Sequence, residues 1–443
     1  MKEIEKLILE KKYSEFKQEI SNFDSADIAE ILSELNDELL IKFYRLLPKD
    51  IAAETFSFLE LDSQQTIINS LTAKEAATII DNMYADDATD LLEEMPANII
   101  QKILSKTTPE TRKDINQLLM YPADSAGSIM TVEFMDIKDF MNVKDAINKV
   151  KKEAIDKETI DFCYVLDKQR KLVGTVSLKQ LILANEEAAI KDIMEDNPIV
   201  VNTKEDQEEV ANLFKKYDLT TMPVVDSENR LVGIITIDDV IDIMEEEASE
   251  DIAKISGMLP TEKPYLKLNL WDIYKSRMPW LLFLMISATF TGAIISHFEG
   301  ALASAAILTV FMPMVMGTGG NAGGQASVTI IRALSLNEIE FKDAIRVILK
   351  ESAVGLICGA TLCICNFIKL LLFDKVGFMI SLVVCISLFL TVLFAKIIGA
   401  ILPILADKIK LDPAVMANPI ITTIVDAGSL FVYFQVASML LGL

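Results

Sequence analysis

The chain has 443 residues, a formal net charge of −23 and 51% hydrophobic residues, with a mean hydropathy of +0.34. A soluble protein this acidic is not also this hydrophobic, so these averages combine two unlike halves. Residues 1–271 carry 55 acidic and 31 basic side chains, a net charge of −24, whereas residues 272–443 carry 10 and 11. This division excludes a single soluble domain. It also argues against nucleic-acid binding, which needs a basic surface.

The first 120 residues are predicted to be helical, with no strand pattern. Short helices, several of them beginning at a capping residue or a proline, are predicted at 25–35, 48–59, 72–83 and 85–95. Helices this short do not bury a core singly, so we expect them to stack as a small superhelix that ends near Tyr121.

An internal repeat follows, in which residues 163–177 match residues 222–236 at a shift of 59 residues. Each copy predicts a strand, a polar turn, a second strand that begins Leu-Val-Gly, and then a helix. Amphipathic helices are predicted just before the two copies, at 143–153 and 206–217. The pattern resembles a tandem pair of CBS domains, which are regulatory modules.

The CBS resemblance implies a candidate adenine-nucleotide site. Many CBS pairs hold the nucleotide through a Ser or Thr and an Asp that follow the glycine of the Leu-Val-Gly in the second strand. The second copy has Thr236 and Asp239 at these positions. The first copy has Ser177, but Gln180 stands where the Asp is expected, so the first half-site departs from the pattern.

Uncharged apolar runs begin after Arg277 and predict five membrane-spanning helices, since about 20 apolar residues cross a bilayer. The runs cover residues 278–296, 300–331, 352–373, 376–406 and 413–443. Basic residues gather before the first run, between the second and third, and before the fifth. The positive-inside rule therefore predicts a cytosolic N-terminal half and an external C-terminus, in a multi-pass protein of the cell membrane.

The last apolar run contains one charged residue, Asp426. Asn418, Thr422, Asp426, Ser429 and Tyr433 recur at helical spacing and form one polar stripe. A stripe with one carboxylate and several neutral oxygens suits a hydrated hard cation, and acids inside membrane helices usually mark an ion path. The alternative is a protonated Asp426 that is hydrogen-bonded to a neighbouring helix.

Residues 316–325 read Met-Gly-Thr-Gly-Gly-Asn-Ala-Gly-Gly-Gln. The glycines allow two interpretations: they let helices pack closely, or they free backbone carbonyls to line a cavity. Asn321 and Gln325, one turn apart, favour the second interpretation.

The acidic surplus is most concentrated at residues 238–251, which hold eight carboxylates and no base. A charge run is usually a solvated face. This one, however, connects the second repeat to the first span, and like charges one turn apart destabilise a helix until a cation neutralises them. EF-hand spacing is absent. The five cysteines form no C-x-x-C pair, so the sequence predicts neither a zinc site nor disulfides, and we expect the polar half to lie in reducing cytosol.

This order of segments resembles the MgtE family of magnesium channels and transporters over the whole chain. The most specific stretches are residues 317–325 and 412–419, followed by Asp426. The resemblance implies four parts: an acidic all-α superhelical domain (1–122), an α/β tandem CBS pair (123–245), an acidic connecting helix (246–272) and a five-helix transmembrane pore domain (273–443). It also implies a homodimer with the pore on its two-fold axis.

The family's functional residues transfer by resemblance. Asp426 of both subunits would hold hydrated Mg²⁺, with Asn418, Asn321 and Thr422 along the ion pathway. The cytosolic Mg²⁺ sensor would comprise Glu54, Asp86, Asp90, Gly127, Asp206, Glu208, Asp218, Asp239, Asp242, Glu247, Glu250, Asp251 and Asp412.

The expected function is Mg²⁺ uptake through a pore. Intracellular Mg²⁺ is expected to close this pore by bridging the acidic sites. One alternative is a Co²⁺ or Mn²⁺ transporter controlled mainly by adenine nucleotide, with ATP otherwise a modulator. An intramembrane enzyme is disfavoured, because the spans offer only Asp426 and an edge histidine, His297, with no paired-acid or zinc motif.

Overall fold

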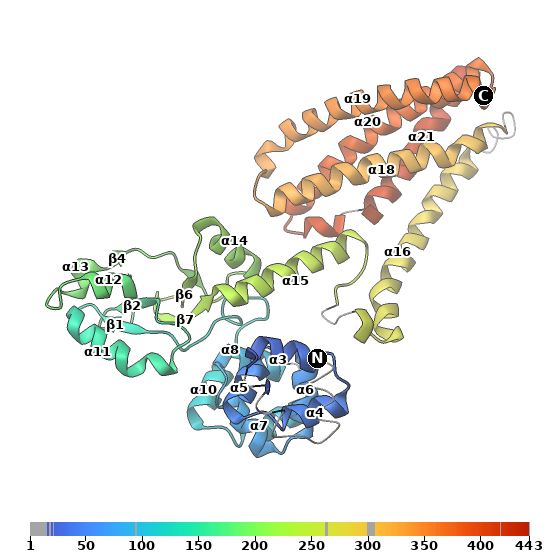
Figure 1. Cartoon of the computed structure of the whole chain (residues 1–443). Coiled ribbons are helices and arrows are strands. Elements are labelled where there is room, and N and C mark those ends of the chain that lie inside the picture. Colours follow the sequence, from blue (N-terminus) through green and yellow to red (C-terminus); the bar gives the residue numbers. More distant parts are fainter. Residues whose placement is uncertain are drawn as a thin grey trace. The chain divides into compact units, whose positions relative to one another are not determined.

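The computed structural model describes residues 16, 19–20, 22–93, 95–261, 265–298, 306–416 and 418–442 (Figure 1). Most of the first 21 residues, and the start of the predicted second span, lie outside this description. The chain forms two compact units, Met1–Met244 and Glu245–Leu443. The boundary between them falls inside the acidic helix predicted to connect the repeats to the membrane.

The N-terminal domain is a stack of short helices, as predicted. The four predicted helices are present as α3, α5, α7 and α8, with ends within three residues of those expected, and four more lie between and after them. The helices are α3 (Ser25–Ser33), α4 (Asp37–Tyr44), α5 (Lys49–Ser57), α6 (Leu61–Ser70), α7 (Ala73–Ile80), α8 (Ala85–Glu93), α9 (Ala97–Leu104) and α10 (Pro109–Leu118).

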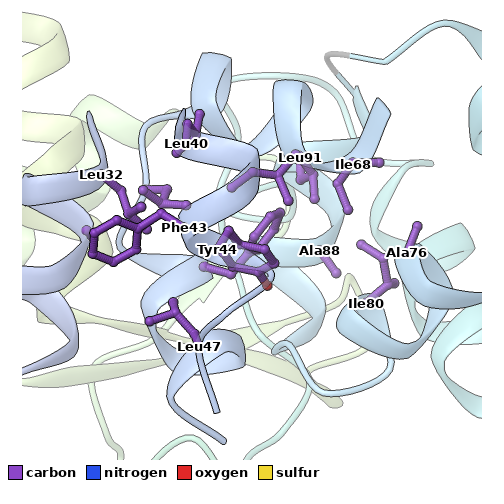
Figure 2. Close-up of a cluster of buried hydrophobic side chains, with 14 of the residues drawn as sticks. Leu32, Leu40, Phe43, Tyr44, Leu47, Ile68, Ala76, Ile80, Ala88 and Leu91 are labelled. Carbon is purple, nitrogen blue, oxygen red and sulfur yellow. The ribbon is translucent and has the colours of Figure 1, made fainter. Parts of the chain in front are cut away.

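No single helix of this domain has a core of its own, and the helices bury one shared cluster. Figure 2 shows this cluster, in which Phe43 and Leu32 are fully buried together with Ile80 from a helix much later in the chain. Local signals set the helix starts: Thr72 and Glu75 form a reciprocal capping box at the start of α7. Packing of many short amphipathic faces then supplies the stability that each helix lacks alone.

The two repeats have the same register, as the shift of 59 residues predicts. In the first, β1 (Asp136–Lys138) pairs parallel with β2 (Phe162–Leu166), and β2 pairs antiparallel with β3 (Leu172–Ser177). In the second, β5 (Val201–Asn202), β6 (Thr221–Val225) and β7 (Leu231–Thr236) repeat this arrangement. The remaining elements are α11 (Val143–Glu153), η1 (Ala154–Asp156), α12 (Leu178–Leu183), α13 (Ile190–Ile193), β4 (Glu195–Asp196) and α14 (Gln207–Tyr217).

The repeats share a core, so they fold as a pair. Tyr164 and Leu172 of the first repeat pack with Ile234 of the second in one buried cluster. The Tyr164 hydroxyl donates a hydrogen bond to Oγ1 of Thr221 at 3.1 Å. The amide of Leu172 donates to the carbonyl of Asn229 at 3.1 Å, which joins the polar turns of the two copies.

The acidic helix differs in extent from the prediction of a connecting helix over 246–272. It is α15 (Ile237–Ile255), which begins directly after β7 and ends well before the first span. Gly257, with φ of +68°, lies just past its end, where a left-handed residue closes a helix. The short η2 (Tyr265–Lys267) precedes the next long helix, α16.

The C-terminal unit is built from long helices (Figure 1). They are α16 (Leu270–His297), α18 (Leu308–Ser335), α19 (Ala344–Leu372), α20 (Phe378–Lys408) and α21 (Asn418–Leu441), with η3 (Phe341–Asp343) before α19 and η4 (Pro413–Met416) before α21. Among the described residues, four segments are long and apolar enough to cross a membrane: Leu270–His297, Phe341–Leu372, Phe378–Lys408 and Pro419–Leu441.

Helix α18, which covers most of the predicted second span, is the exception. Its 28 residues are enough to cross a bilayer, but Thr318, Asn321, Gln325 and the glycines lower its hydropathy. It nevertheless packs against α20 and α21 inside the bundle. Helix α16, by contrast, is mostly exposed, since only 6% of its apolar window is buried.

The glycine-rich stretch is regular helix, which corrects the expectation of irregular backbone that lines a cavity. Residues 317–325 lie in the middle of α18. A Cβ atom on Gly319 would come within 2.7 Å of Thr391 on α20 and Ser429 on α21. The glycines therefore let three helices approach closely, as small residues do in membrane bundles.

Gly399 offers a test of this packing. A Cβ atom there would collide with the carbonyl oxygen of Gly323 and lie 3.1 Å from Ala326. We expect Gly399→Val to lower the melting temperature of the purified protein in detergent by several degrees, about 5 °C or more, because α18 and α20 must separate. Gly292→Ala is the control, since no other part of the described chain lies within 4 Å of a Cβ atom at that position on α16. Equal melting temperatures for both variants would contradict the close packing.

Candidate pore and acidic regulatory site

The polar stripe of α21 faces α18. Ser429 is fully buried against Gly319, and the buried Tyr433 donates a hydrogen bond from its hydroxyl to the carbonyl of Leu308 at 2.9 Å. A Cβ on Gly320 would lie 3.3 Å from Cγ2 of Thr422 and 3.7 Å from Oδ1 of Asp426. The described residues of the predicted stripe therefore share one face of α21, and the C-terminal part of that face, Ser429 and Tyr433, serves helix packing.

Asp426 is half-buried at the middle of α21, beside Gly320. Within the described part of the chain no group donates a hydrogen bond to its carboxylate, although a buried acid with a structural role is normally bonded. Gly320 places backbone and no side chain opposite this carboxylate. This geometry favours the ion-path interpretation over a protonated Asp that bonds a neighbouring helix.

The other predicted pore residues are placed less fully. Asn321 follows Gly320 directly, and both Asn321 and Gln325 are exposed on α18 in the single chain. Thr422 lies beside Gly320, and its hydroxyl donates to the carbonyl of Pro419 at 3.0 Å. Asn418 is the first residue of α21, but its side chain lies outside the described residues.

In the N-terminal unit, the acids of α8 meet those at the start of α15. Asp86 is 7% exposed, and its pKa is raised well above the ordinary value by burial and by the charge of Asp239. Burial and the charges of Asp239 and Asp238 raise the pKa of Asp87 to about 6. The pKa of Asp239 is likewise raised to about 6, chiefly by burial. Helices from two domains thus bring like charges together, which repel unless neutralised.

Glu158 joins this group from the loop after η1. Burial and the charges of Asp238 and Asp239 raise its pKa to about 8, and its Oε2 is buried without a hydrogen-bond partner among the described residues. We name Asp86, Asp87, Glu158, Asp238 and Asp239 the acidic junction. Sequence motifs do not reveal Glu158, because a lone acid in a loop carries no periodic signal.

The other predicted sensor residues fall into separate places. Residues 124–127 run beside 203–207: the amide of Gly127 donates to the carbonyl of Thr203 at 3.0 Å, and Asp206 caps α14 through the amide of Glu208. Asp218 ends α14 in a left-handed conformation. Glu54 accepts a hydrogen bond from Ser25, and Asp90 and Asp242 lie one turn beyond acidic-junction residues on α8 and α15.

In the C-terminal unit, Glu250 and Asp412 are both paired with Lys254, which sequence reasoning did not single out. Asp251 follows Glu250 directly, and Glu247 precedes it by one turn. Across the described residues, no three His, Cys, Asp or Glu side chains form a ready-made metal-binding group. The sensor acids are therefore near one another in sets but do not form a closed cage.

The candidate nucleotide residues cap helices. The Thr236 hydroxyl donates to Oδ2 of Asp239 at 2.6 Å. Ser177 and Gln180 form a reciprocal capping box at the start of α12, and Gln180 also donates to Glu195 at 3.0 Å. Gln180 thus performs the capping role in the first repeat that Asp239 performs in the second.

Comparisons with known proteins agree with this architecture. Residues 312–436 match the family described as "MgtE: Divalent cation transporter", residues 23–124 match the MgtE intracellular N domain, and residues 190–246 match the CBS domain. The magnesium transporter MgtE of Bacillus subtilis is 35% identical over 436 residues, which are 98% of this chain and 95% of the relative. That of Thermus thermophilus is 38% identical over 345 residues, which are 77% of this chain and 75% of the relative.

Among solved structures, one similar chain is the cytosolic domain of the Mg²⁺ channel MgtE in complex with ATP. It is 34% identical, with a TM-score of 0.52, and the match covers 54% of this chain and 98% of that one. The soluble part of a magnesium transporter is 31% identical with the same TM-score. The family is one of divalent cation transporters and not of enzymes. On the extent and identity of these matches, the chain belongs to the MgtE family.

Proposed function

We propose that this protein carries Mg²⁺ into the cell through a pore beside Asp426, as a homodimer whose cytosolic domains close the pore when internal Mg²⁺ is high. The observation that carries the transport proposal is the half-buried carboxylate of Asp426, opposite Gly320 in the middle of an apolar bundle. The named activity of its relatives supports the same substrate. Mg²⁺ flux into proteoliposomes, for the parent chain and for Asp426→Asn, tests it.

A hydrated ion suits this position. Mg²⁺ dehydrates reluctantly and keeps several waters, so it prefers few, well-spaced oxygen ligands over a tight protein cage. Asp426 supplies one carboxylate, and Thr422 and Asn321 are neutral oxygen ligands at or next to Gly320, the residue opposite Asp426. Asn418 remains a candidate ligand from its place at the start of α21. The exposed Asn321 and Gln325 belong to a polar face of α18 that a second copy of the chain would cover in a dimer.

The orientation of the protein in the membrane follows from its charges. The acidic half and the basic residues near Arg277 and Arg346 lie on the cytosolic side in this proposal, with the C-terminus outside. The regulatory acids then face the compartment whose Mg²⁺ concentration they sense.

The acidic junction is the proposed centre of this sensing. At low Mg²⁺ its carboxylates repel one another, and at high Mg²⁺ the bound ion favours the arrangement in which α8 and α15 lie together. A ligand shifts such an equilibrium only by binding one state better. The donor set fits Mg²⁺, because every member is a carboxylate and Glu158 has a buried oxygen without a described partner.

The acidic junction predicts how the stability of the cytosolic fragment 1–260 depends on pH. The folded-state pKa values of Asp87, Asp239 and Glu158 are raised, so between about pH 4 and pH 8 the folded state binds more protons than the unfolded state. Without Mg²⁺, the free energy of unfolding is therefore expected to fall as pH rises through this range. Added Mg²⁺ is expected to restore it at pH 8 and to have little effect at pH 5.

Urea unfolding at several pH values, with and without Mg²⁺, measures these free energies. The double variant Asp27→Asn/Glu30→Gln is a matched control, since both acids are exposed on α3. If the free energy of unfolding of the parent fragment rises between pH 5 and pH 8 in Mg²⁺-free buffer, the raised pKa values are contradicted.

Adenine nucleotide is proposed as a modulator of this response. The ATP complex of the related cytosolic domain supports it, and Ser177, Thr236 and Asp239 are the candidate residues. Control mainly by nucleotide gains no support from the geometry, because the Thr236 hydroxyl is already bonded to Asp239. Calorimetric titration of ATP into the 1–260 fragment, with and without Mg²⁺, separates the two roles.

A further inference from the structure

Lys254 lies in the last turn of α15 and makes two short ion pairs. Its Nζ is 2.7 Å from Oε2 of Glu250, one turn earlier on the same helix, and 2.7 Å from Oδ2 of Asp412. The Lys254 side chain is 24% exposed and those of Glu250 and Asp412 are 35% and 34% exposed, so both pairs are partly shielded from solvent. Shielded pairs that join separate elements contribute more than exposed ones, and loss of one partner leaves an uncompensated charge.

Asp412 is oriented for this contact by its own backbone. Its Oδ1 accepts a hydrogen bond from the amide of Ala414 at 2.7 Å, which turns the chain into η4 and leaves Oδ2 for Lys254. Helix η4 leads directly into α21, the helix that carries Asp426. The ion pair therefore joins the acidic helix to the base of the proposed pore helix.

Two uncharged contacts lie beside the ion pair. Ile255 packs against Ile331 of α18 and Ala414 of η4. Gly257 lies against Pro419 in the first turn of α21, where a Cβ atom would come within 2.7 Å of the Pro419 Cγ. This position requires glycine for two reasons, the φ of +68° and the close approach of Pro419. The end of α15 is thus attached to α18 and α21 by charge, apolar packing and close approach.

The charge balance makes Lys254 unusual. It is the only basic residue between Arg230 and Lys263, a stretch that contains nine acids. Burial alone would lower the pKa of Lys254, but hydrogen bonds and charges from Asp412 and Glu250 raise it above its usual value. Burial and the charge of Asp412 raise the pKa of the adjacent Asp251. The ammonium stays charged at every physiological pH and neutralises this end of the helix.

We propose that Lys254 is a built-in cation that fixes the end of α15 to the base of α21 without Mg²⁺. Glu250 and Asp412 then serve the lysine and not the ion, and Mg²⁺ sensing belongs to the other acids, above all those of the acidic junction. Lys254 is a positioning residue, because it acts on the pore through α21. The regulatory consequence rests on the proposed Mg²⁺ feedback, whereas the attachment itself does not.

Cross-linking of the full-length protein tests the attachment directly. In a chain whose five cysteines are replaced by serine, Ile255→Cys and Ala414→Cys should be joined by a short bismaleimide reagent in EDTA, with no Mg²⁺ present. Lys254→Met should lower the initial cross-linking rate about tenfold, and Lys254→Arg should retain it. Lys342→Met is the control, since that lysine pairs with Glu340 on the exposed surface. Cross-linking that requires Mg²⁺ in the parent would overturn the proposal.

Mg²⁺ flux into proteoliposomes tests the consequence. In Lys254→Met, the Mg²⁺ concentration that halves the flux should rise about tenfold, because Mg²⁺ must now also supply the lost neutralisation. Flux at low Mg²⁺ should match the parent, and Lys254→Arg should restore the parental midpoint. An unchanged midpoint, or a lower one that indicates competition between the ammonium and Mg²⁺, would overturn the assigned role. Loss of Mg²⁺ inhibition in the parent would instead contradict the proposed feedback, and the cross-linking result would still decide the attachment.

Discussion

Replacement of Asp426 by Asn is expected to reduce Mg²⁺ uptake into proteoliposomes to about the level of empty vesicles. The substitution keeps the size of the side chain and its helix propensity but removes the carboxylate charge beside Gly320. A divalent ion in an apolar bundle depends on that charge, because membrane-buried acids offset the cost of bringing a cation to this depth. A fluorescent Mg²⁺ indicator inside the vesicles measures the initial rate.

Asp374→Asn is the matched control for this experiment. Asp374 lies just past the end of α19 and pairs with Lys369 at 3.0 Å, so the same chemical change is made away from the contact between α18 and α21. Asp426→Glu keeps the charge and is expected to retain a measurable part of the flux. Both Asp426 variants should elute from size exclusion as the parent does. Parental uptake by Asp426→Asn would contradict the assigned ion path.

The second large effect is expected on regulation. Asp86→Asn combined with Asp239→Asn should raise the Mg²⁺ concentration that halves the flux by about tenfold or more, because the acidic junction loses the two carboxylates that couple its helices. Asparagine preserves side-chain volume at both positions, so the fold is retained. Flux at low Mg²⁺ should stay within about twofold of the parent, since neither residue belongs to the membrane unit.

The exposed pair Asp27→Asn/Glu30→Gln again serves as a control, with the same loss of two charges from the same compact unit, Met1–Met244. Tryptic digestion of both variants with and without Mg²⁺ gives a second measurement, because bound Mg²⁺ should protect the parent and the control but not the acidic-junction variant. If the acidic-junction variant keeps both the parental Mg²⁺ concentration for half-maximal flux and the parental protection from trypsin, the acidic junction is excluded as the sensor.

Local sequence signals predicted much of the fold. The shift of 59 residues placed the strands of the two repeats, because an identical pattern of apolar runs and turn residues folds into the same hairpin twice. Helix α11 has the predicted ends, and α14 begins one residue later than expected. Capping residues and helical periodicity operate within one or two turns, so they can be read without the tertiary structure.

Features that depend on contacts between distant segments were predicted less well. The glycine-rich stretch was expected to be irregular, but the approach of α20 and α21 to Gly319 explains the same glycines within a regular helix. The acidic helix was predicted to reach residue 272, yet it ends at Ile255, where Gly257 contacts Pro419. A sequence pattern does not reveal which neighbour a glycine must accommodate.

The sequence by itself determined that this protein has an acidic N-terminal half, a paired α/β repeat and an apolar C-terminal half whose last apolar run holds one carboxylate, because composition, periodicity and charge are properties of short segments. Only the tertiary structure decided which charges meet. It added Glu158 to the acidic junction and paired Glu250 and Asp412 with Lys254. Electrostatic interactions act through space over a few ångströms, so residues more than 150 positions apart become partners only when the chain has folded.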